Sequence, residues 1–230
     1  MSFKQFTKEL NGNRVEGEIL KTVFYSLVTS FIVIGILYLL ILKNVTNFIP
    51  KYGFYLFLAA ISYALILPTV RQVRAYKHFN CMSGMMIGMT IGMISGFLIG
   101  LVVGATNGMF VGSIVGMTIG MSVGTWAGKC CGAMGVMEGM MAGLMGGLMG
   151  AMTSLMVLND HLKIIIPILV IASSIILIGL DYLIYKETTG AQIRKINKPS
   201  FSSFLTLCFI VTMIITWIMV YGPKSALFSI

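Results

Sequence analysis

Residues 84–132 read GMMI GMTI GMIS GFLI GLVV GATN GMFV GSIV GMTI GMSV GTWA GKCC G, with a glycine at every fourth position. Positions i and i+4 share one face of an α-helix, so this repeat leaves a groove along that face. In a bilayer, where burying apolar surface between helices gains little, such grooves let helices approach closely. We therefore expect tight packing through Gly84, Gly88, Gly92, Gly96, Gly112, Gly116, Gly120 and Gly124, joined further along the chain by Gly139 and Gly143.

Around this repeat the chain is strongly apolar: 57% of its 230 residues are hydrophobic and only 10% are charged. Seven uninterrupted apolar stretches are each long enough to cross a hydrocarbon layer of about 30 Å at about 1.5 Å per residue. The sequence therefore predicts an all-α fold, a polytopic transmembrane helix bundle with seven spans. These spans are Leu20–Leu42, Gly53–Val70, Cys81–Gly104, Met109–Gly128, Gly132–Leu158, Ile164–Tyr185 and Phe201–Tyr221.

The chain is expected to have four parts, of which the glycine-rich stretch forms most of the third. Residues 1–19 form a cytoplasmic N-terminal segment, and residues 20–79 form the first two spans with a basic inner loop. Residues 80–158 form a core of three helices, the third to fifth spans, which pack as a glycine zipper. Residues 159–230 form the last two spans with a second basic inner loop. Within the core, we expect the polar run 105–107 to form a turn where the chain returns to water.

The sixteen Lys and Arg residues predict the orientation, because cationic residues near span ends are retained on the cytoplasmic side. With the N-terminus in the cytoplasm and the C-terminus outside, twelve of them fall on inner segments and four on outer ones. We therefore expect a multi-pass protein of the cell membrane, with the lipid bilayer as its partner. The cationic residues form no basic helix with interleaved aromatic residues, so we expect no nucleic-acid partner.

Methionine is the second unusual feature, because sixteen of the nineteen methionines lie between Met82 and Met156. They form ladders offset by one or two positions from the glycines, so we expect their thioethers to edge the glycine groove. Thioether sulfur is a soft ligand that selects Cu(I) or Ag(I), although methionine also fills gaps in packed helices. The candidate metal ligands are Met82, Met85, Met86, Met89, Met93, Met117, Met121, Met137, Met141, Met145 and Met149.

Three cysteines are expected at one mouth of the core. In the predicted orientation the third span starts in the cytoplasm at Cys81, and the fourth returns there at Cys130 and Cys131. Thiolates bind Cu(I) strongly, so this mouth is a candidate place for capture or release of the ion. The alternative is a set of inert interfacial thiols.

Acidic residues are rare in the predicted spans. Glu138 lies about 10 Å inside the fifth span, where a carboxylate is costly unless it faces a cavity or a partner. Glu138 is the candidate intramembrane acid. Three roles are open to it: binding a cation, relaying protons, or pairing with Lys129 near the inner surface. Asp181, near the inner end of the sixth span, is expected at the interface.

The combination of MxxxM pairs with a GxxxG repeat resembles the core of the Ctr-type copper-uptake transporters. The MxxxM pairs are Met82 with Met86 and Met85 with Met89. This resemblance implies Met pairs that select Cu(I) between helices packed through glycine. That family has three spans, trimerises and carries a Met-rich outer N-terminus, whereas this chain has seven expected spans and a charged N-terminus. The chain is also similar to uncharacterised Met/Gly-rich multi-pass membrane proteins of prokaryotes, and that likeness implies no defined activity.

Two functions from different classes follow. The first is transport or handling of Cu(I) or Ag(I) along the methionine ladders, with Cu(I) as the one expected metal. The second is a glycine-zipper scaffold or oligomeric channel, in which copies of the chain form a homo-oligomer and methionine only fills space. An enzyme is not expected, because the sequence has two His and no GxSxG, HExxH or Walker motif from which an active site could be built.

Overall fold

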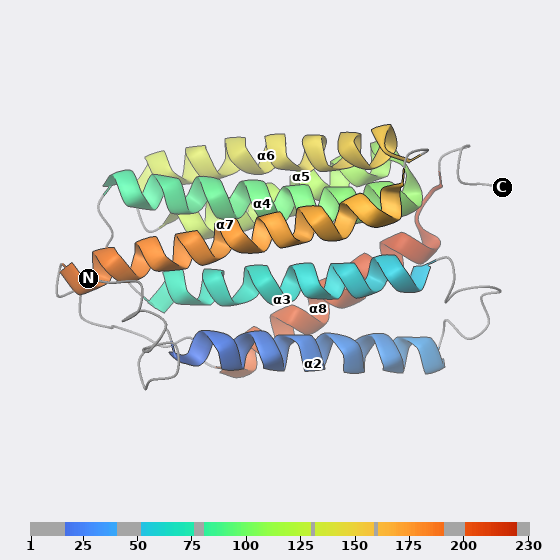
Figure 1. Ribbon diagram of the computed structural model, residues 1–230, viewed down its shortest axis with the longest axis horizontal. Coiled ribbons are helices and arrows are strands. Elements are labelled where there is room, and N and C mark those ends of the chain that lie inside the picture. The colour runs from blue at the N-terminus through green and yellow to red at the C-terminus, as the bar shows by residue number, and fades with distance from the viewer. Residues whose placement is uncertain are drawn as a thin grey trace.

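The computed structural model describes residues 17–40, 52–75, 81–129, 132–158, 161–190 and 201–224. Seven long helices form this part of the chain and run roughly along its longest axis (Figure 1). The all-α prediction is confirmed. The helices are α2 (Gly17–Leu40), α3 (Phe54–Ala75), α4 (Cys81–Asn107), α5 (Met109–Gly128), α6 (Gly132–Met156), α7 (Leu162–Gly190) and α8 (Phe201–Tyr221).

Six of these helices, α2 to α7, are long and apolar enough to cross a membrane. The chain is therefore a polytopic helical membrane protein, as the sequence predicts. The seventh predicted span corresponds to α8, a helix of 21 residues. Its apolar segment within the described residues is Phe209–Tyr221, which is shorter than the other six.

α4 is the central helix of the bundle, because it contacts α3, α5, α6, α7 and α8. Its two faces carry side chains of opposite size. One face has the glycine repeat and packs closely against α5 and α6. The other face carries Ile87, Ile91, Leu98 and Leu101, which are fully buried in a core of large apolar side chains shared with α3, α7 and α8. In Figure 1, α4, α5 and α6 form one side of the bundle and α2, α3 and α8 form the other, with α7 alongside α3 and α4.

The glycines of α4, α5 and α6 meet in layers, with one residue from each helix. A Cβ atom placed on Gly92 would lie 2.7 Å from the Gly139 carbonyl oxygen and 3.1 Å from Gly124 Cα. Any side chain there would collide with backbone, so the glycine packing predicted from the repeat is present. The layers are Gly88 with Gly128 and Gly135, Gly92 with Gly124 and Gly139, Gly96 with Gly120 and Gly143, Gly100 with Gly116 and Gly147, and finally Gly104 with Gly112 and Ala151.

Backbone therefore fills the axis of this three-helix unit. At several of these glycines the atom nearest to an added Cβ position is a carbonyl oxygen of a neighbouring helix, so the glycine Cα–H bonds point toward that oxygen, as in weak Cα–H···O contacts between membrane helices. Gly84, at the start of the series, is buried as well. Within these three helices no room is left on the axis for a side chain or an ion.

A single residue, Gly108, connects α4 to α5. Its φ of 105° is a conformation that glycine adopts readily and other residues rarely do.

The prediction that residues 105–107 return to water is wrong, because they continue α4 and are buried. Asn107 Nδ2 donates to the Ile218 carbonyl oxygen of α8 at 2.8 Å, and the Thr106 hydroxyl donates to Asn107 Oδ1 at 2.9 Å. Protein groups thus replace water as the partners of these polar atoms.

Polar contacts also connect the outer helices. Arg71 Nη1 on α3 donates to Thr22 Oγ1 on α2 at 2.8 Å. At the opposite end of the bundle, Lys224 Nζ, which follows α8, donates to the Tyr52 hydroxyl just before α3. Both contacts tie segments that are distant in sequence, and they fix α2, α3 and α8 relative to one another.

Candidate functional site

The predicted methionine ladders lie on the outside of the glycine-packed unit. Eight of the candidate ligands expose a large part of their side chains, from 42% for Met93 to 77% for Met82. The thioethers of these eight residues therefore lie outside the glycine groove and not between the helices. The physical reason is that backbone from the neighbouring helices occupies the groove and pushes the remaining positions of each helix outward. The eight exposed candidates are Met82, Met86, Met89, Met93, Met137, Met141, Met145 and Met149.

The other three candidate methionines, Met85, Met117 and Met121, are half-buried. Further methionines that the candidate set leaves out join the exposed ones on α6. Met134, Met140, Met152 and Met156 are all exposed, so the outer face of α6 is a methionine surface along its whole length.

Part of the methionine surface borders the line where α4 touches α6. Gly146 of α6 packs directly against the Met93 carbonyl oxygen of α4, and Gly150 packs against the Phe97 carbonyl oxygen. Met89 and Met93 on α4, and Met145 and Met149 on α6, lie within about one helical turn of these contacts. The structure thus brings exposed thioethers from two helices to one outer seam.

The predicted cysteine mouth falls largely outside the described residues. Cys130, Cys131 and residues 76–80 before α4 are outside the described residues. Cys81 is the first residue of α4. The proposed gathering of three thiols therefore stays a prediction.

Glu138 is half-buried on α6 and lies about two turns from the start of that helix. In the described part of the chain it makes no ion pair with Lys129, which is exposed at the end of α5. The carboxylate instead lies among the methionines of α6, close in sequence to Met137 and Met141. Of the three roles expected for Glu138, cation binding and proton relay stay predictions.

Two buried polar side chains have atoms without a hydrogen-bond partner among the described residues. They are Gln72 of α3, through both Nε2 and Oε1, and Asp181 of α7, through Oδ1. Asp181 is only 7% exposed because neighbouring helices cover it, and its expected place near the membrane interface stays a prediction. α3 and α7 pack against each other, and both residues lie in the C-terminal halves of their helices. Sequence reasoning passed over Gln72 because a single uncharged amide hardly interrupts an apolar stretch.

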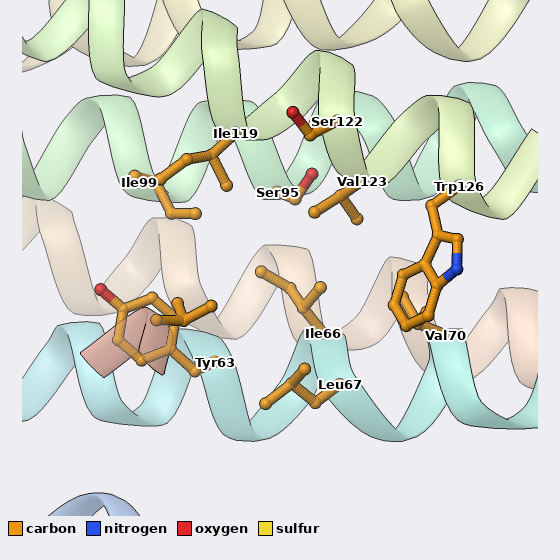
Figure 2. A pocket seen from close by; sticks show the side chains of 11 residues that line it. Tyr63, Ile66, Leu67, Val70, Ser95, Ile99, Ile119, Ser122, Val123 and Trp126 are labelled. Carbon is orange, nitrogen blue, oxygen red and sulfur yellow. The ribbon is translucent and has the colours of Figure 1, made fainter. Parts of the chain in front are cut away.

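A cavity of about 350 Å³ lies where the glycine-packed unit meets the outer helices. Figure 2 shows Ile66 of α3 pointing toward Ile119 and Val123 of α5, with Leu67 and Val70 on the same α3 side of the cavity. Its remaining walls come from Tyr63, Ser95, Ile99, Ser122, Trp126 and Val211. The sequence gives no signal for this cavity, because its residues come from four helices and carry no shared spacing.

The two serine hydroxyls in this wall are already committed to backbone. Ser95 Oγ donates to the Gly92 carbonyl oxygen at 3.0 Å, and Ser122 Oγ donates to the Thr118 carbonyl oxygen at 2.6 Å. Serine in membrane helices often satisfies its hydroxyl in this way. The walls of the cavity are therefore mainly apolar, and the other polar side-chain groups among its lining residues are the Tyr63 hydroxyl and the Trp126 indole nitrogen.

Among the described residues, no three His, Cys, Asp or Glu side chains come together as a metal-binding group. These four residue types do not include methionine, so this finding says nothing about metal binding by the methionine surface. No protein-family model, no curated protein and no solved structure matches this chain.

Proposed function

We propose that this chain is a membrane scaffold, in which a rigid unit of three glycine-packed helices presents the methionine face of α6 to a second copy of the chain. The single observation that supports it is the series of layers in which one glycine from each of α4, α5 and α6 brings the three backbones together. Such a unit has little freedom to repack, because interdigitating backbone leaves no space for alternative side-chain positions.

The partner surface is the outer face of α6. Met141 and Met145 are 65% and 55% exposed there, beside Leu144 and Leu148. α6 contacts α4 and α5 on one side only, and the rest of the helix faces away from the bundle (Figure 1). Flexible thioethers adapt to an opposing surface better than branched side chains do, which favours protein contact over lipid contact alone.

The proposed orientation places the N-terminus in the cytoplasm, the C-terminus outside, and seven spans in the cell membrane. The distribution of Lys and Arg between the two sides supports it. Reporter fusions after Lys77, Lys129 and the C-terminus test the topology, because the first two should report from the cytoplasm and the third from outside.

The oligomer is tested by counting chains per assembly in native membrane nanodiscs. Replacing Met141 and Leu148 by Trp should break the assembly, because two large rings on α6 prevent close approach of a second copy. The matched control replaces Ile171 and Ile178 by Trp; these residues are 59% and 51% exposed on α7, and the change should leave the assembly intact. Single chains in the parent protein, or equal loss with both pairs, would refute the scaffold proposal.

A second candidate function is binding of Cu(I) or Ag(I) at the outer seam between α4 and α6. The observation that favours it is the approach of exposed methionines from both helices to this seam, with Met93 backbone against Gly146. Neutral thioether ligands bind soft monovalent ions without releasing protons. In this proposal the ion lies on the protein surface that faces the membrane or a second copy, because backbone closes the interior.

Metal content of the purified protein, measured by mass spectrometry, tests this second function. Replacing Met89, Met93, Met145 and Met149 by Leu should abolish bound copper while the fold survives. The control replaces two exposed methionines elsewhere by Leu: Met109 at the start of α5, and Met140 of α6, which follows the α5 contact Gly139. Copper absent from the parent, or unchanged by the first replacement, ends the metal proposal.

A further inference from the structure

The cavity between α3 and α5 is large enough for a ligand, and most of the side chains that line it are apolar. Its volume of about 350 Å³ falls in the range of small-molecule pockets, about 300–1,000 Å³. Because the hydroxyl hydrogens of Ser95 and Ser122 are donated to their own helices, a polar ligand would find few partners here. Burying unpaired polar groups is costly, so the chemistry favours an apolar occupant.

The cavity is elongated along the helices. On α3 it extends from Tyr63 to Val70, and on α5 from Ile119 to Trp126. Seven residues at about 1.5 Å each give a length of about 10 Å, roughly a third of a hydrocarbon layer of about 30 Å. An elongated apolar space of this length inside membrane-spanning helices fits part of a straight acyl chain.

One wall of the cavity is accessible from outside the bundle. The α3 side chains that line it are buried, whereas Ile119, Val123 and Trp126 on α5 are half-buried and Ser122 is exposed. α5 packs along its length against α4 and α6 but touches α3 at few positions, so the gap arises where these two helices separate. An acyl chain can therefore enter sideways from the bilayer.

Cationic residues lie at one end of the cavity. Lys129 is exposed and follows Trp126 by three residues, which places it about one turn beyond the ring on the same side of α5. Arg71 follows Val70 on α3 at the same end, but its guanidinium donates to Thr22 of α2, so Lys129 is the cation placed to bind a head group. An anionic head group near Lys129 would thus continue into an acyl chain inside the cavity.

We infer that the cavity holds one acyl chain of an anionic phospholipid whose phosphate is bound by Lys129. The proposed scaffold function does not use this site, so either proposal can fail without the other. The lipid would fill the gap between the glycine-packed unit and the outer helices and so hold these two parts of the bundle together.

Lipid retained after detergent washing tests the site. We expect the parent protein to keep one phosphatidylglycerol per chain from an equal mixture with phosphatidylcholine. Replacing Ile119 and Val123 by Phe fills the cavity and should remove that lipid. The control Ile114→Phe makes the same change on the exposed face of α5, outside the cavity, and should retain it. Lys129→Gln should keep a lipid but lose the preference for phosphatidylglycerol.

A second measurement does not depend on the folding of the cavity variant. In a Trp217→Phe background, Trp126 is the only tryptophan, and phosphatidylglycerol with brominated acyl chains should quench it more strongly than brominated phosphatidylcholine. Retention of no lipid by the parent, equal retention by the Ile119→Phe/Val123→Phe variant, or equal quenching by both lipids would overturn the inference.

Discussion

α6 and α7 follow one another in the chain, and both are long apolar helices with a row of large side chains on the outside. They differ on the inside. The buried residues of α6 are mostly Gly and Ala, whereas α7 buries Leu162, Ile166, Val170 and Leu177. The comparison shows that inward-facing residues set how closely a helix approaches its neighbours. α6 packs backbone against backbone, and α7 packs side chain against side chain.

The outward faces differ too, and packing within the chain does not explain this. The exposed face of α6 is methionine, whereas that of α7 is isoleucine, including Ile168, Ile171 and Ile175. Either residue type is compatible with lipid. The choice of methionine on α6 is therefore where a function beyond folding should be sought.

The largest expected effect comes from adding volume to the inside of α6. Gly143→Leu would drive a side chain into the Gly120 carbonyl group and the Met121 amide of α5. We expect a loss of about 3 kcal/mol or more in unfolding free energy, because overpacking against backbone cannot relax by rotamer changes. Thermal unfolding in detergent measures it. Gly179→Leu on α7, with nothing within 4 Å of its Cβ position, is the control and should cost little.

The next largest effect comes from removing volume from the inside of α7. Ile166 is fully buried, and Ile166→Ala should cost about 2–4 kcal/mol through the cavity that it leaves. The same measurement applies. A loss below that of Ile168→Ala, whose side chain is 56% exposed, would contradict the side-chain packing assigned to α7.

A sign reversal sharpens the comparison further. Gly96→Ala in the glycine-packed unit should destabilise by about 1–3 kcal/mol, because its Cβ would lie 2.7 Å from the Gly143 carbonyl oxygen. Gly179→Ala on α7 should stabilise by up to about 1 kcal/mol, because alanine is the better helix former. Equal changes of the same sign at both positions would mean that the glycine layers do not exist.

The smallest effect should follow from exchanging the two outer faces. Replacing Met137, Met141, Met145 and Met149 by Leu should change stability by less than about 0.5 kcal/mol per residue, because these side chains are exposed. Replacing Ile168, Ile171 and Ile175 by Met should be equally mild. A cooperative collapse of the bundle after the methionine replacement would show that thioethers take part in packing after all.

The sequence predicted the helices and their membrane character well, because an uninterrupted apolar stretch leaves few alternatives in lipid. The period of the glycines also identified the helices that pack most closely. The glycine period could not predict whether each remaining residue of a helix faces a neighbouring helix or the outside of the bundle. For this reason the methionines, at offsets of one or two residues from glycine, were expected to edge the glycine groove, whereas most of them are exposed on the outside of the unit and some border the seam between α4 and α6.

Two other features depend on tertiary contacts that no local pattern encodes. Asn107 looked like a turn residue in water, but its partner is the Ile218 carbonyl oxygen, 111 residues away. The cavity likewise combines residues of α3, α4, α5 and α8, and the apolar composition of its walls is the same as that of the packed core.

The central claim is that glycine fills the inside of the α4, α5 and α6 unit while methionine faces out. It is tested most directly by NMR of methyl-labelled methionine in nanodiscs that contain a lipid with a spin label on its acyl chain. Met219 of α8 is fully buried and serves as the internal reference. For a single chain in its nanodisc, the account predicts strong broadening of the Met141 and Met145 methyl signals and none for Met219. Protection of Met141 and Met145 equal to that of Met219, in a chain shown to be single in its nanodisc, would contradict it.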